Sequence, residues 1–377
     1  MSAKPLAIFA IASLLPIAAS GAKLTVLHSF GPGDGVHPRS GVTLDDNGNF
    51  YGTTLHGGDF SAGTVYKMTP KGKETVLYSF KGTTDGAFPY AKPARDAAGT
   101  LYGTTNGGDV SSDFGTVFKL TAKKEKALHI LASSPDGCFP ESDLLADAAG
   151  NFYGTASACA VGAGSVFKIT PNGKFTVIYS FLGGTDGANP PAGVISDGAD
   201  GLYGTTYNGG LGWGTVYKLT TGGTHTVLYS FTGGPDGRNP ATGLVADGLG
   251  NLYGTTYFGG NTDAGVVFKL GSDGGETVLH SFTGGNDGAN PQGALIVDAK
   301  GNLYGTASQG GEGNAGTVFE IAKNGKFKVL YAFKEVGQID GANPGAELYL
   351  APDGTLYGTT QNGGENASGA VFKLTTR

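Results

Sequence analysis

The sequence predicts an all-β protein, a seven-bladed β-propeller with four-stranded blades, and three observations lead to this prediction. The same unit recurs seven times along the chain. Each unit contains four short runs with the composition of β-strands. The first strand-like run of the chain is the one that the last unit lacks, so the two ends can complete one blade together.

Composition excludes the other broad classes of protein. The chain has 69 glycines among 377 residues and only 15% charged residues, which is unlike a helical bundle or a coiled coil. Hydrophobic residues make up 39%, enough to bury a large core, so the chain is not disordered. Glycine shows no strict triplet period, which excludes collagen. A turn-rich all-β chain remains.

Three short motifs recur in constant order and define the repeat. An Asp-Gly pair begins at Asp34, Asp85, Asp136, Asp186, Asp236, Asp287 and Asp340. A proline follows each pair, at Pro38, Pro89, Pro140, Pro190, Pro240, Pro291 and Pro344. The tripeptide Tyr-Gly-Thr then begins, at spacings of 51, 51, 50, 50, 51 and 53 residues, at Tyr51, Tyr102, Tyr153, Tyr203, Tyr253, Tyr304 and Tyr357. Repeats of about 40 to 50 residues with four strands each are typical of β-propellers.

The unit over 224–270 shows how each strand is predicted. β-Branched and aromatic residues alternate in TVLYSF, LYGTT and VVFKL, and turn residues bound each run. In chain order the strands are expected at 226–231, 243–247, 252–256 and 266–270. Neither face of these strands is clearly polar, as expected when a sheet packs against neighbours on both sides.

The two ends of the chain predict closure of the ring. The run LTVLHSF over 24–30 has the pattern of the outermost strand of a blade, and the chain ends with a third strand at 369–377. Pairing these two strands completes the seventh sheet and leaves no open edge. An open solenoid would instead need atypical capping units, and the seven units show none.

Strand order places the two longer loops of each unit, the Asp-Gly loop and the Gly-Gly loop, on the same face of the ring, where we expect a site. Cys138 lies in the Asp-Gly loop of the third unit and Cys159 in its Gly-Gly loop. We expect these cysteines to form a disulfide in an exported protein, with two free thiols as the alternative.

The N-terminus predicts export. Lys4 is followed by an apolar run over 6–17 and small residues over 18–22. This pattern is typical of a secretory signal peptide, residues 1–22, which leaves 23–377 as a single propeller domain. An uncleaved N-terminal anchor is the alternative. We expect a secreted, periplasmic or extracellular monomer with no membrane span after cleavage, because the run is shorter than the roughly 20 residues of a span.

The repeats resemble the Gloeo-Verruco, or GloVer, tandem repeat of exported bacterial proteins. The matching elements are GTVFKL-type runs (115–120, 214–219), TVLYSF (75–80, 226–231), the GGxDGxxP loops and DxxGNLYGTT (247–256). The resemblance covers nearly the whole chain after the signal peptide and implies a propeller-like exported protein with no assigned activity or catalytic residues. Members are often joined to C-terminal sorting anchors, whereas this chain stops at Arg377 with no hydrophobic tail.

Several kinds of chemistry are not predicted. The net charge of −6 comes without a Lys/Arg cluster, so we expect no nucleic-acid partner. The Asp-Gly aspartates could suggest calcium, but a spacing of about fifty residues favours turn stabilisation over shared ions. The second aspartate series, Asp45 to Asp298, has the same turn role. His28, His129 and His280 fall in strands, where packing is expected. We predict no metal site and no cofactor, and the chain lacks HExxH and GxSxG motifs.

Aromatic residues in the predicted loops favour binding. They are Phe60, Phe88, Tyr90, Phe114, Tyr207, Trp213, Tyr257 and Phe258. Rings with Asn and Asp neighbours suit stacking on sugars, although each ring by itself could fill a gap between blades. We take Trp213, Tyr207, Tyr257, Phe258, Phe60 and Tyr90 as candidate ligand-binding residues.

These observations favour a non-catalytic protein that binds a glycan or a protein partner through the long-loop face. The alternative is a polysaccharide-active hydrolase or lyase with its site at the channel mouth, which needs a converging pair of carboxylates. No catalytic residue is assigned; the first candidates for such a pair are Glu141, Asp143, Glu312 and Glu365. A structural envelope protein without a small ligand is a third hypothesis.

Overall fold

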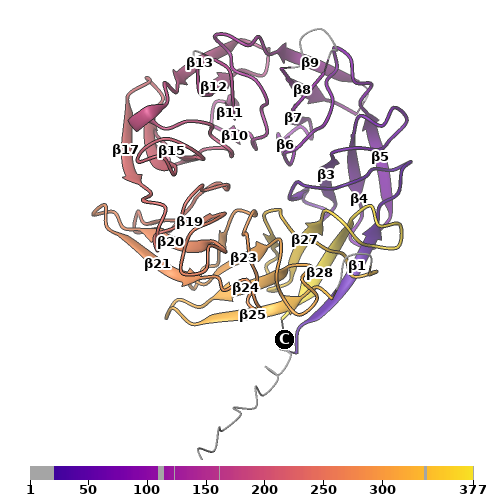
Figure 1. Cartoon of the computed structure of the whole chain (residues 1–377). Helices are drawn as coiled ribbons and strands as arrows, with labels where there is room; N and C mark the ends of the chain where they lie inside the picture. Colours follow the sequence, from indigo (N-terminus) through magenta and orange to yellow (C-terminus); the bar gives the residue numbers. More distant parts are fainter. Residues whose placement is uncertain (1–20, 109–113, 123, 161, 335–337, 377) are drawn as a thin grey trace, which may run out of the picture.

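The computed structural model describes residues 21–108, 114–122, 124–160, 162–334 and 338–376. Within these residues the chain forms seven four-stranded antiparallel sheets arranged as a ring (Figure 1), which confirms the predicted propeller. One short 3₁₀ helix, η1 (Gly184–Asp186), interrupts a loop. The described part contains no helix long and apolar enough to cross a membrane. The predicted signal peptide, 1–22, lies outside the described residues except for its last two.

Strands one and two of each blade lie nearest the axis of the ring. The first strands have only two residues: β2 (Thr43–Leu44), β6 (Ala94–Arg95), β10 (Leu145–Ala146), β14 (Ile195–Ser196), β18 (Val245–Ala246), β22 (Ile296–Val297) and β26 (Tyr349–Leu350). The second strands are β3 (Phe50–Thr54), β7 (Leu101–Thr105), β11 (Phe152–Ala156), β15 (Gly201–Thr206), β19 (Leu252–Thr256), β23 (Leu303–Ala307) and β27 (Leu356–Thr360).

Strands three and four form the outer part of each blade. The third strands are β4 (Thr64–Met68), β8 (Thr116–Leu120), β12 (Ser165–Ile169), β16 (Thr215–Thr220), β20 (Val266–Leu270), β24 (Thr317–Ile321) and β28 (Ala370–Thr375). The fourth are β5 (Glu74–Ser79), β9 (Glu125–Ile130), β13 (Phe175–Ser180), β17 (His225–Ser230), β21 (Glu276–Ser281), β25 (Phe327–Ala332) and β1 (Lys23–Ser29). We number the blades 1 to 7, from the blade that begins with β2 to the blade that begins with β26.

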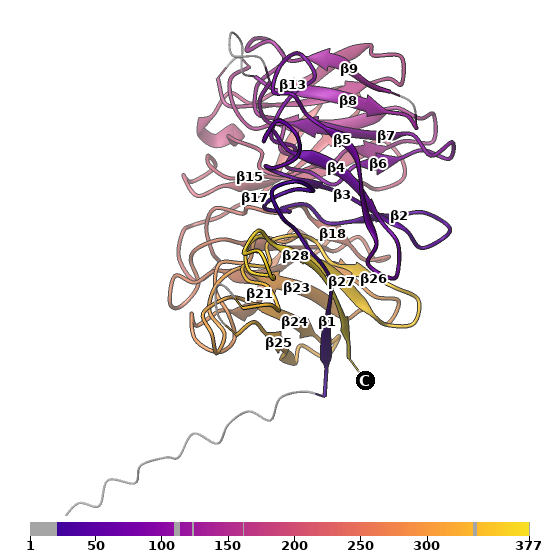
Figure 2. The ribbon, with the colours of Figure 1, turned by 90° about the vertical axis from the view of Figure 1, so that its right-hand side faces the viewer.

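The N-terminal strand closes the ring as predicted. β1 pairs antiparallel with β28 in the sheet β1-β28-β27-β26, with Lys23 opposite Thr375 and Ser29 opposite Ala370. Figure 2 shows the two strands side by side although they come from opposite ends of the chain. Blade 7 therefore has no unpaired β28 edge, which limits pairing with other chains.

The hydrophobic core lies between adjacent blades. Val267 and Phe282 of blade 5, for example, form one buried cluster with Leu303 and Phe319 of blade 6. Equivalent clusters recur around the ring, so each sheet buries apolar side chains on both faces. This explains why the strands show no clear polar face in the sequence.

Two residues of the recurring Tyr-Gly-Thr motif act within their own blade. In blades 1 to 6 the tyrosine hydroxyl donates to the aspartate of the turn between strands one and two, as from Tyr51 to Asp45 at 3.0 Å; blade 7 has Ala351 in place of this aspartate. That aspartate also accepts from backbone N–H groups of its turn, which is the expected stabilising role. The glycine passes under an aromatic ring, where a Cβ on Gly103 would lie only 2.6 Å from Phe118 Cζ.

The threonine of the motif connects neighbouring blades. In six blades its hydroxyl donates to a backbone carbonyl in the segment that enters the next blade, whereas the Thr255 hydroxyl pairs with the Thr242 hydroxyl at 3.1 Å. The pairs are Thr53 to Ala91 (3.0 Å), Thr104 to Ser142 (3.2 Å), Thr155 to Ala192 (3.0 Å), Thr205 to Thr242 (2.9 Å), Thr306 to Ala346 (3.2 Å) and Thr359 to Ser40 (2.9 Å). These bonds fix the segments that surround the axis.

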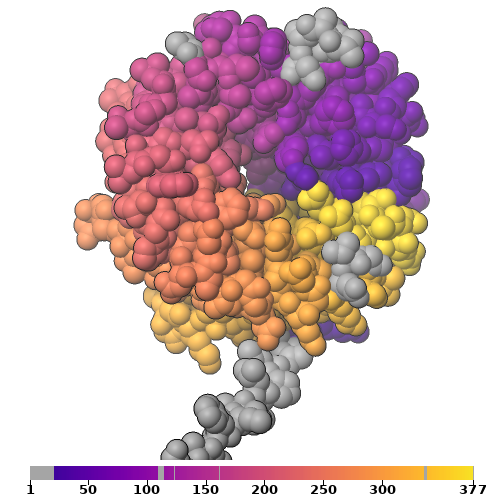
Figure 3. Space-filling model, viewed as in Figure 1, coloured from indigo at the N-terminus to yellow at the C-terminus, as the bar shows by residue number. Residues whose placement is uncertain are grey.

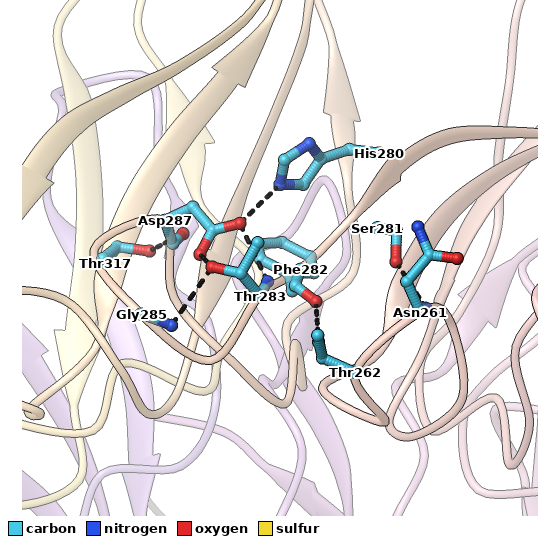
Figure 4. A network of polar contacts seen from close by, with 9 residues as sticks. All are labelled: Asn261, Thr262, His280, Ser281, Phe282, Thr283, Gly285, Asp287 and Thr317. Carbon is cyan, nitrogen blue, oxygen red and sulfur yellow. Dashed lines mark hydrogen bonds and ion pairs between the residues drawn. The ribbon is translucent and has the colours of Figure 1, made fainter. Parts of the chain in front are cut away.

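The aspartate of each Asp-Gly loop accepts a hydrogen bond from the tyrosine or histidine near the end of the preceding fourth strand. Figure 4 shows this pair in blade 5, where His280 Nε2 lies 3.1 Å from Asp287 Oδ2 and the Thr283 backbone N–H donates to the same carboxylate at 3.0 Å. The seven pairs are His28–Asp34, Tyr78–Asp85, His129–Asp136, Tyr179–Asp186, Tyr229–Asp236, His280–Asp287 and Tyr331–Asp340. These aspartates thus stabilise their own loops.

Candidate functional site

A cavity of about 860 Å³ lies on the axis of the ring, on the side of the long loops. All seven blades contribute to its wall, and Figure 3 shows the hollow at the centre of the molecule. Its volume is within the range of small-molecule sites. A second cavity, of about 1060 Å³, is lined mainly by the short hairpin turns of blades 6 and 7 on the opposite face. We take the first as the candidate site because its wall carries the long loops of every blade.

Two positions of the repeat line the candidate site. One is the segment after each recurring proline, which runs inward to the first strand and is held by the threonine bonds described above. The other is the residue after the second strand, which lines the cavity in four blades as Ser157, Tyr207, Tyr257 and Gln361. Because the backbone at both positions repeats around the ring, the side chains alone make the site asymmetric.

Blades 1 and 2 supply an arginine–tyrosine pair to the wall. The Arg39 guanidinium donates to the Tyr90 hydroxyl and lies 5.0 Å from the centre of the Tyr90 ring. With its amide oxygen turned to the guanidinium, Gln361 accepts from Arg39 at 2.6 and 3.0 Å. Arg39 is thereby held at the cavity by residues from the blades on both sides.

Glu141 of blade 3 continues this polar wall. Its carboxylate accepts a hydrogen bond from the Asn106 amide. Burial raises the pKa of Glu141, while Arg39 and the bond from Asn106 oppose this rise. The side chain is therefore easier to protonate than an exposed glutamate, which is the property that a general acid needs.

Lys92 lies deeper and joins two carboxylates. Its ammonium contacts Glu347 and lies 3.3 Å from Asp143 Oδ2, while the Lys92 backbone N–H donates to Asp143 at 3.0 Å. Lys92 and Glu347 line both cavities, so this cluster lies where the two approach each other along the axis.

Blades 4 and 5 supply an aromatic wall. Tyr207 and Tyr257 occupy equivalent positions after β15 and β19, and both line the cavity. Burial and the neighbouring Tyr257 raise the pKa of Tyr207. The lining after the prolines on this side includes the small residues Ala192, Ala241 and Ala294, together with Gln292. The wall therefore offers two phenol rings beside small side chains.

Trp213 and Phe258 form the rim next to this wall. The Arg238 guanidinium lies 5.2 Å from the Trp213 ring and 4.7 Å from the Phe258 ring. Asp263 holds the guanidinium through two hydrogen bonds, at 3.1 and 2.6 Å. Phe258 lines the cavity, whereas Arg238 and Trp213 lie outside its lining.

The backbone before each recurring proline is left-handed. Four blades place asparagine there, at Asn189, Asn239, Asn290 and Asn343, and each amide donates to a carbonyl of the preceding blade. The other three blades place His37, Phe88 and Phe139 there, each with φ of 58°. Bulky residues rarely adopt this conformation, and it is strained for them. These three residues directly precede the segments that carry Arg39, Tyr90 and Glu141.

Of the predicted ligand-binding residues, the structure brings Tyr90, Tyr207, Tyr257 and Phe258 to the cavity and leaves Phe60 and Trp213 out of its lining. Phe60 is 55% exposed in a peripheral loop. Of the four acidic candidates, Glu141 and Asp143 line the cavity, while Glu312 and Glu365 are exposed in Gly-Gly loops and lie outside this lining.

Cys138 and Cys159 form a disulfide in the structure. In each blade the Asp-Gly and Gly-Gly loops pair through a short β-bridge, and in blade 3 Cys138 is bridged to Ala158. Glycine is required where these loops meet, because a Cβ on Gly259 would lie 2.5 Å from the Gly237 Cα. The disulfide thus links covalently a loop pair that hydrogen bonds hold in the other blades.

Gln361, Asn106, Lys92 and Glu347 line or support the cavity but were not candidates in the sequence. The signal that could find them is their place in the repeat. They follow a recurring proline or a Tyr-Gly-Thr strand, and comparing the seven units at those positions separates the polar blades from the small-residue blades.

The closed ring and its axial cavity define the class of the protein, a seven-bladed β-propeller with a cavity of ligand size. Within that class, the chain belongs to the Gloeobacter/Verrucomicrobia repeat family, whose sequence model matches residues 12–212 and 202–377. This confirms the resemblance noted in the repeats. No curated protein matches the chain.

Solved structures with low sequence identity share the fold. The extracellular domain of a putative one-component system from B. thetaiotaomicron is 13% identical, with a TM-score of 0.60 over 92% of this chain and 40% of that chain. A puromycin hydrolase is 16% identical, with a TM-score of 0.54 over 86% of this chain and 50% of that one. The chain thus spans half or less of these proteins, and the similarity concerns the fold alone.

Proposed function

We propose that this is an exported protein that binds a carbohydrate in the axial cavity on its long-loop face. The observation that carries the proposal is the division of the cavity wall. Tyr207 and Tyr257 lie on one side, and the polar groups of Arg39, Tyr90 and Glu141 lie on the other. Phenol rings suit stacking on the apolar face of a sugar, and hydrogen-bonding groups around them suit its hydroxyls.

Two further features support binding of an external ligand. The threonine bonds and paired loops hold the cavity wall in place before binding, which lowers the entropic cost of association. The extracellular domain of the B. thetaiotaomicron system shows that a propeller of this kind occurs in a protein exposed outside the cell. A protein partner at the same face is the alternative ligand, since the rim of Trp213 and Phe258 also suits a protein contact.

A broad polysaccharide array tests the proposal. We expect saturable binding to one glycan class, and Tyr257→Ala should lower the affinity at least ~10-fold because one stacking ring is lost from the cavity. Phe60→Ala is the matched control, since it removes an exposed aromatic ring outside the cavity lining and should leave binding unchanged. A blank array, or equal losses in both variants, would contradict the proposal.

A polysaccharide-active enzyme is the second candidate, and the raised pKa of Glu141 beside Asp143 favours it. A glycan found on the array would be incubated with the protein and assayed for new reducing ends and for unsaturated products. If Glu141 is the general acid, Glu141→Gln should abolish turnover and keep binding. Binding without any product in the wild type would leave the non-catalytic function.

A further inference from the structure

A second set of polar residues lies far from the cavity, at the junctions between the fourth strands of neighbouring blades. We call this periphery of the propeller the outer rim. At each junction, the Tyr/His–Asp pair of one blade faces the first part of the fourth strand of the next blade. Phe175 stacks on His129 with ring centres 4.1 Å apart, and Phe327 stacks on His280 at 3.6 Å. His225 lies 3.3 Å from Asp186. The residues at this facing position are Leu24, Glu74, Glu125, Phe175, His225, Glu276 and Phe327.

The junction of blades 7 and 1 differs from the others in its chemistry. It combines His28, Asp34 and Glu74, and one ligand atom from each lies within 4.8 Å of the other two. Among the described residues, this is the one group of three His, Cys, Asp or Glu side chains close enough to hold a metal ion. Every other junction lacks at least one of the three residue types at these positions.

Two observations indicate that this group is suited to a ligand. Glu74 Oε1 is buried and has no hydrogen-bond partner, which is costly for a carboxylate oxygen; Glu125 and Glu276 share this feature at their junctions, but only Glu74 has a histidine beside its aspartate. His28 and Asp34 retain 18% and 28% exposure of their side chains, so water and ions can reach the group. His28 Nε2 lies 2.8 Å from Asp34 Oδ2, so an ion between them would replace the hydrogen bond that joins them in this structure.

We propose that His28, Asp34 and Glu74 form a divalent-cation site, suited to Zn²⁺, that joins the N-terminal strand to the first blade. One imidazole nitrogen and two carboxylate oxygens are a ligand set that Zn²⁺ accepts, with water in the fourth position. The ion balances the charge of the two carboxylates and gives Glu74 Oε1 a partner. The three ligand atoms lie within 4.8 Å of one another, so binding would draw them together around an ion at zinc–ligand distances of about 2 Å.

The position of the site suggests what the ion does. His28 belongs to β1, which completes blade 7, and Glu74 begins β5 of blade 1. A bound ion therefore fastens the strand that closes the ring to the neighbouring blade. Because the folded ring would bind the ion more tightly than the unfolded chain, the ion should stabilise the closed propeller.

Zinc titration of the metal-stripped protein by calorimetry, with metal analysis after dialysis, tests the site. We expect one Zn²⁺ per chain and a higher thermal midpoint with zinc than with EDTA. His28→Tyr should abolish both effects and still fold, because it reproduces the Tyr78–Asp85 pair of the next junction. Glu74→Gln should also abolish binding. No binding to the wild type, or unchanged binding in both variants, would overturn the proposal.

A variant that adds a second metal site tests the proposal without relying on a loss of binding, which misfolding could also cause. Tyr229 and Asp236 face Glu276 at the junction of blades 4 and 5, so Tyr229→His creates a second His, Asp and Glu group there. The stoichiometry should rise from one to two Zn²⁺ per chain. A stoichiometry that stays at one would contradict the geometry on which the proposal rests.

Discussion

Glu276 should make the stability of the ring depend on pH. Its carboxyl lies at the junction of blades 4 and 5, near Asp236, and its Oε1 atom is buried without a hydrogen-bond partner. Burial, and then the charge of Asp236, raises the pKa of Glu276 from 4.5 to about 7. The folded state therefore holds a proton that the unfolded chain releases at a lower pH.

The sign and size of the effect follow from proton linkage. A raised pKa contributes stability that is fully present below pH 4.5 and is lost as the pH rises through 7. Without solvent screening, a pKa rise from 4.5 to about 7 corresponds to a change of roughly 3 kcal/mol in the free energy of unfolding. The side chain is only partly buried, so solvent screening reduces the expected effect to about 1 to 2 kcal/mol.

Urea unfolding of the wild type and of Glu276→Gln at pH 5 and pH 8 measures this effect. The wild type should lose about 1 to 2 kcal/mol more of its free energy of unfolding between the two pH values than the variant does. Glu312→Gln is the matched control, because Glu312 is exposed in a loop, and it should behave like the wild type. The same pH dependence in the wild type and in Glu276→Gln would refute the reasoning.

Three further predictions concern the loops and the ends of the chain. Replacing Cys138 and Cys159 together with serine should lower the free energy of unfolding by about 2 to 4 kcal/mol, measured by urea unfolding, because the bridge closes a loop with a sequence separation of 21; no change would show that the bridge does not form. Arg238→Ala should weaken glycan binding several-fold in a titration while the thermal midpoint stays the same, because Arg238 positions Trp213 and Phe258 at the rim; unchanged affinity would remove the rim from the site. Deleting residues 1–30 should produce oligomers in size-exclusion chromatography, since β28 then presents an open edge; a stable monomer would contradict the role of β1 in closure.

The fold could be predicted from the sequence because every local signal recurs seven times. A single TVLYSF run could be a strand or part of a buried helix, but seven copies in constant order with four strands each leave one architecture. Closure followed from the pattern of 24–30, which matches the outermost strand. The first strands have only two residues each, whereas the sequence predicts longer runs, because a run of strand-forming residues does not show how many of them pair with a neighbour.

The candidate site could be predicted only in part. The sequence could place the long-loop face and the aromatic residues Tyr90, Tyr207, Tyr257 and Phe258 that line the cavity, because strand order alone decides which loops share a face. The pairing of Arg39 with Tyr90 could not be found in the same way, because it joins residues 51 positions apart whose side chains meet only when the ring closes. Side-chain direction, which sequence does not give, also decides that Phe60 lies outside the cavity lining.

Hydroxyl-radical footprinting of the protein with and without a saturating oligosaccharide from the array tests the central claim most directly. We expect protection of Tyr207, Tyr257 and Tyr90 on ligand binding, with Phe60 and the exposed fourth strands unchanged. Protection confined to the outer rim or to the hairpin face, with these three tyrosines equally reactive in both states, would contradict a carbohydrate site in the axial cavity.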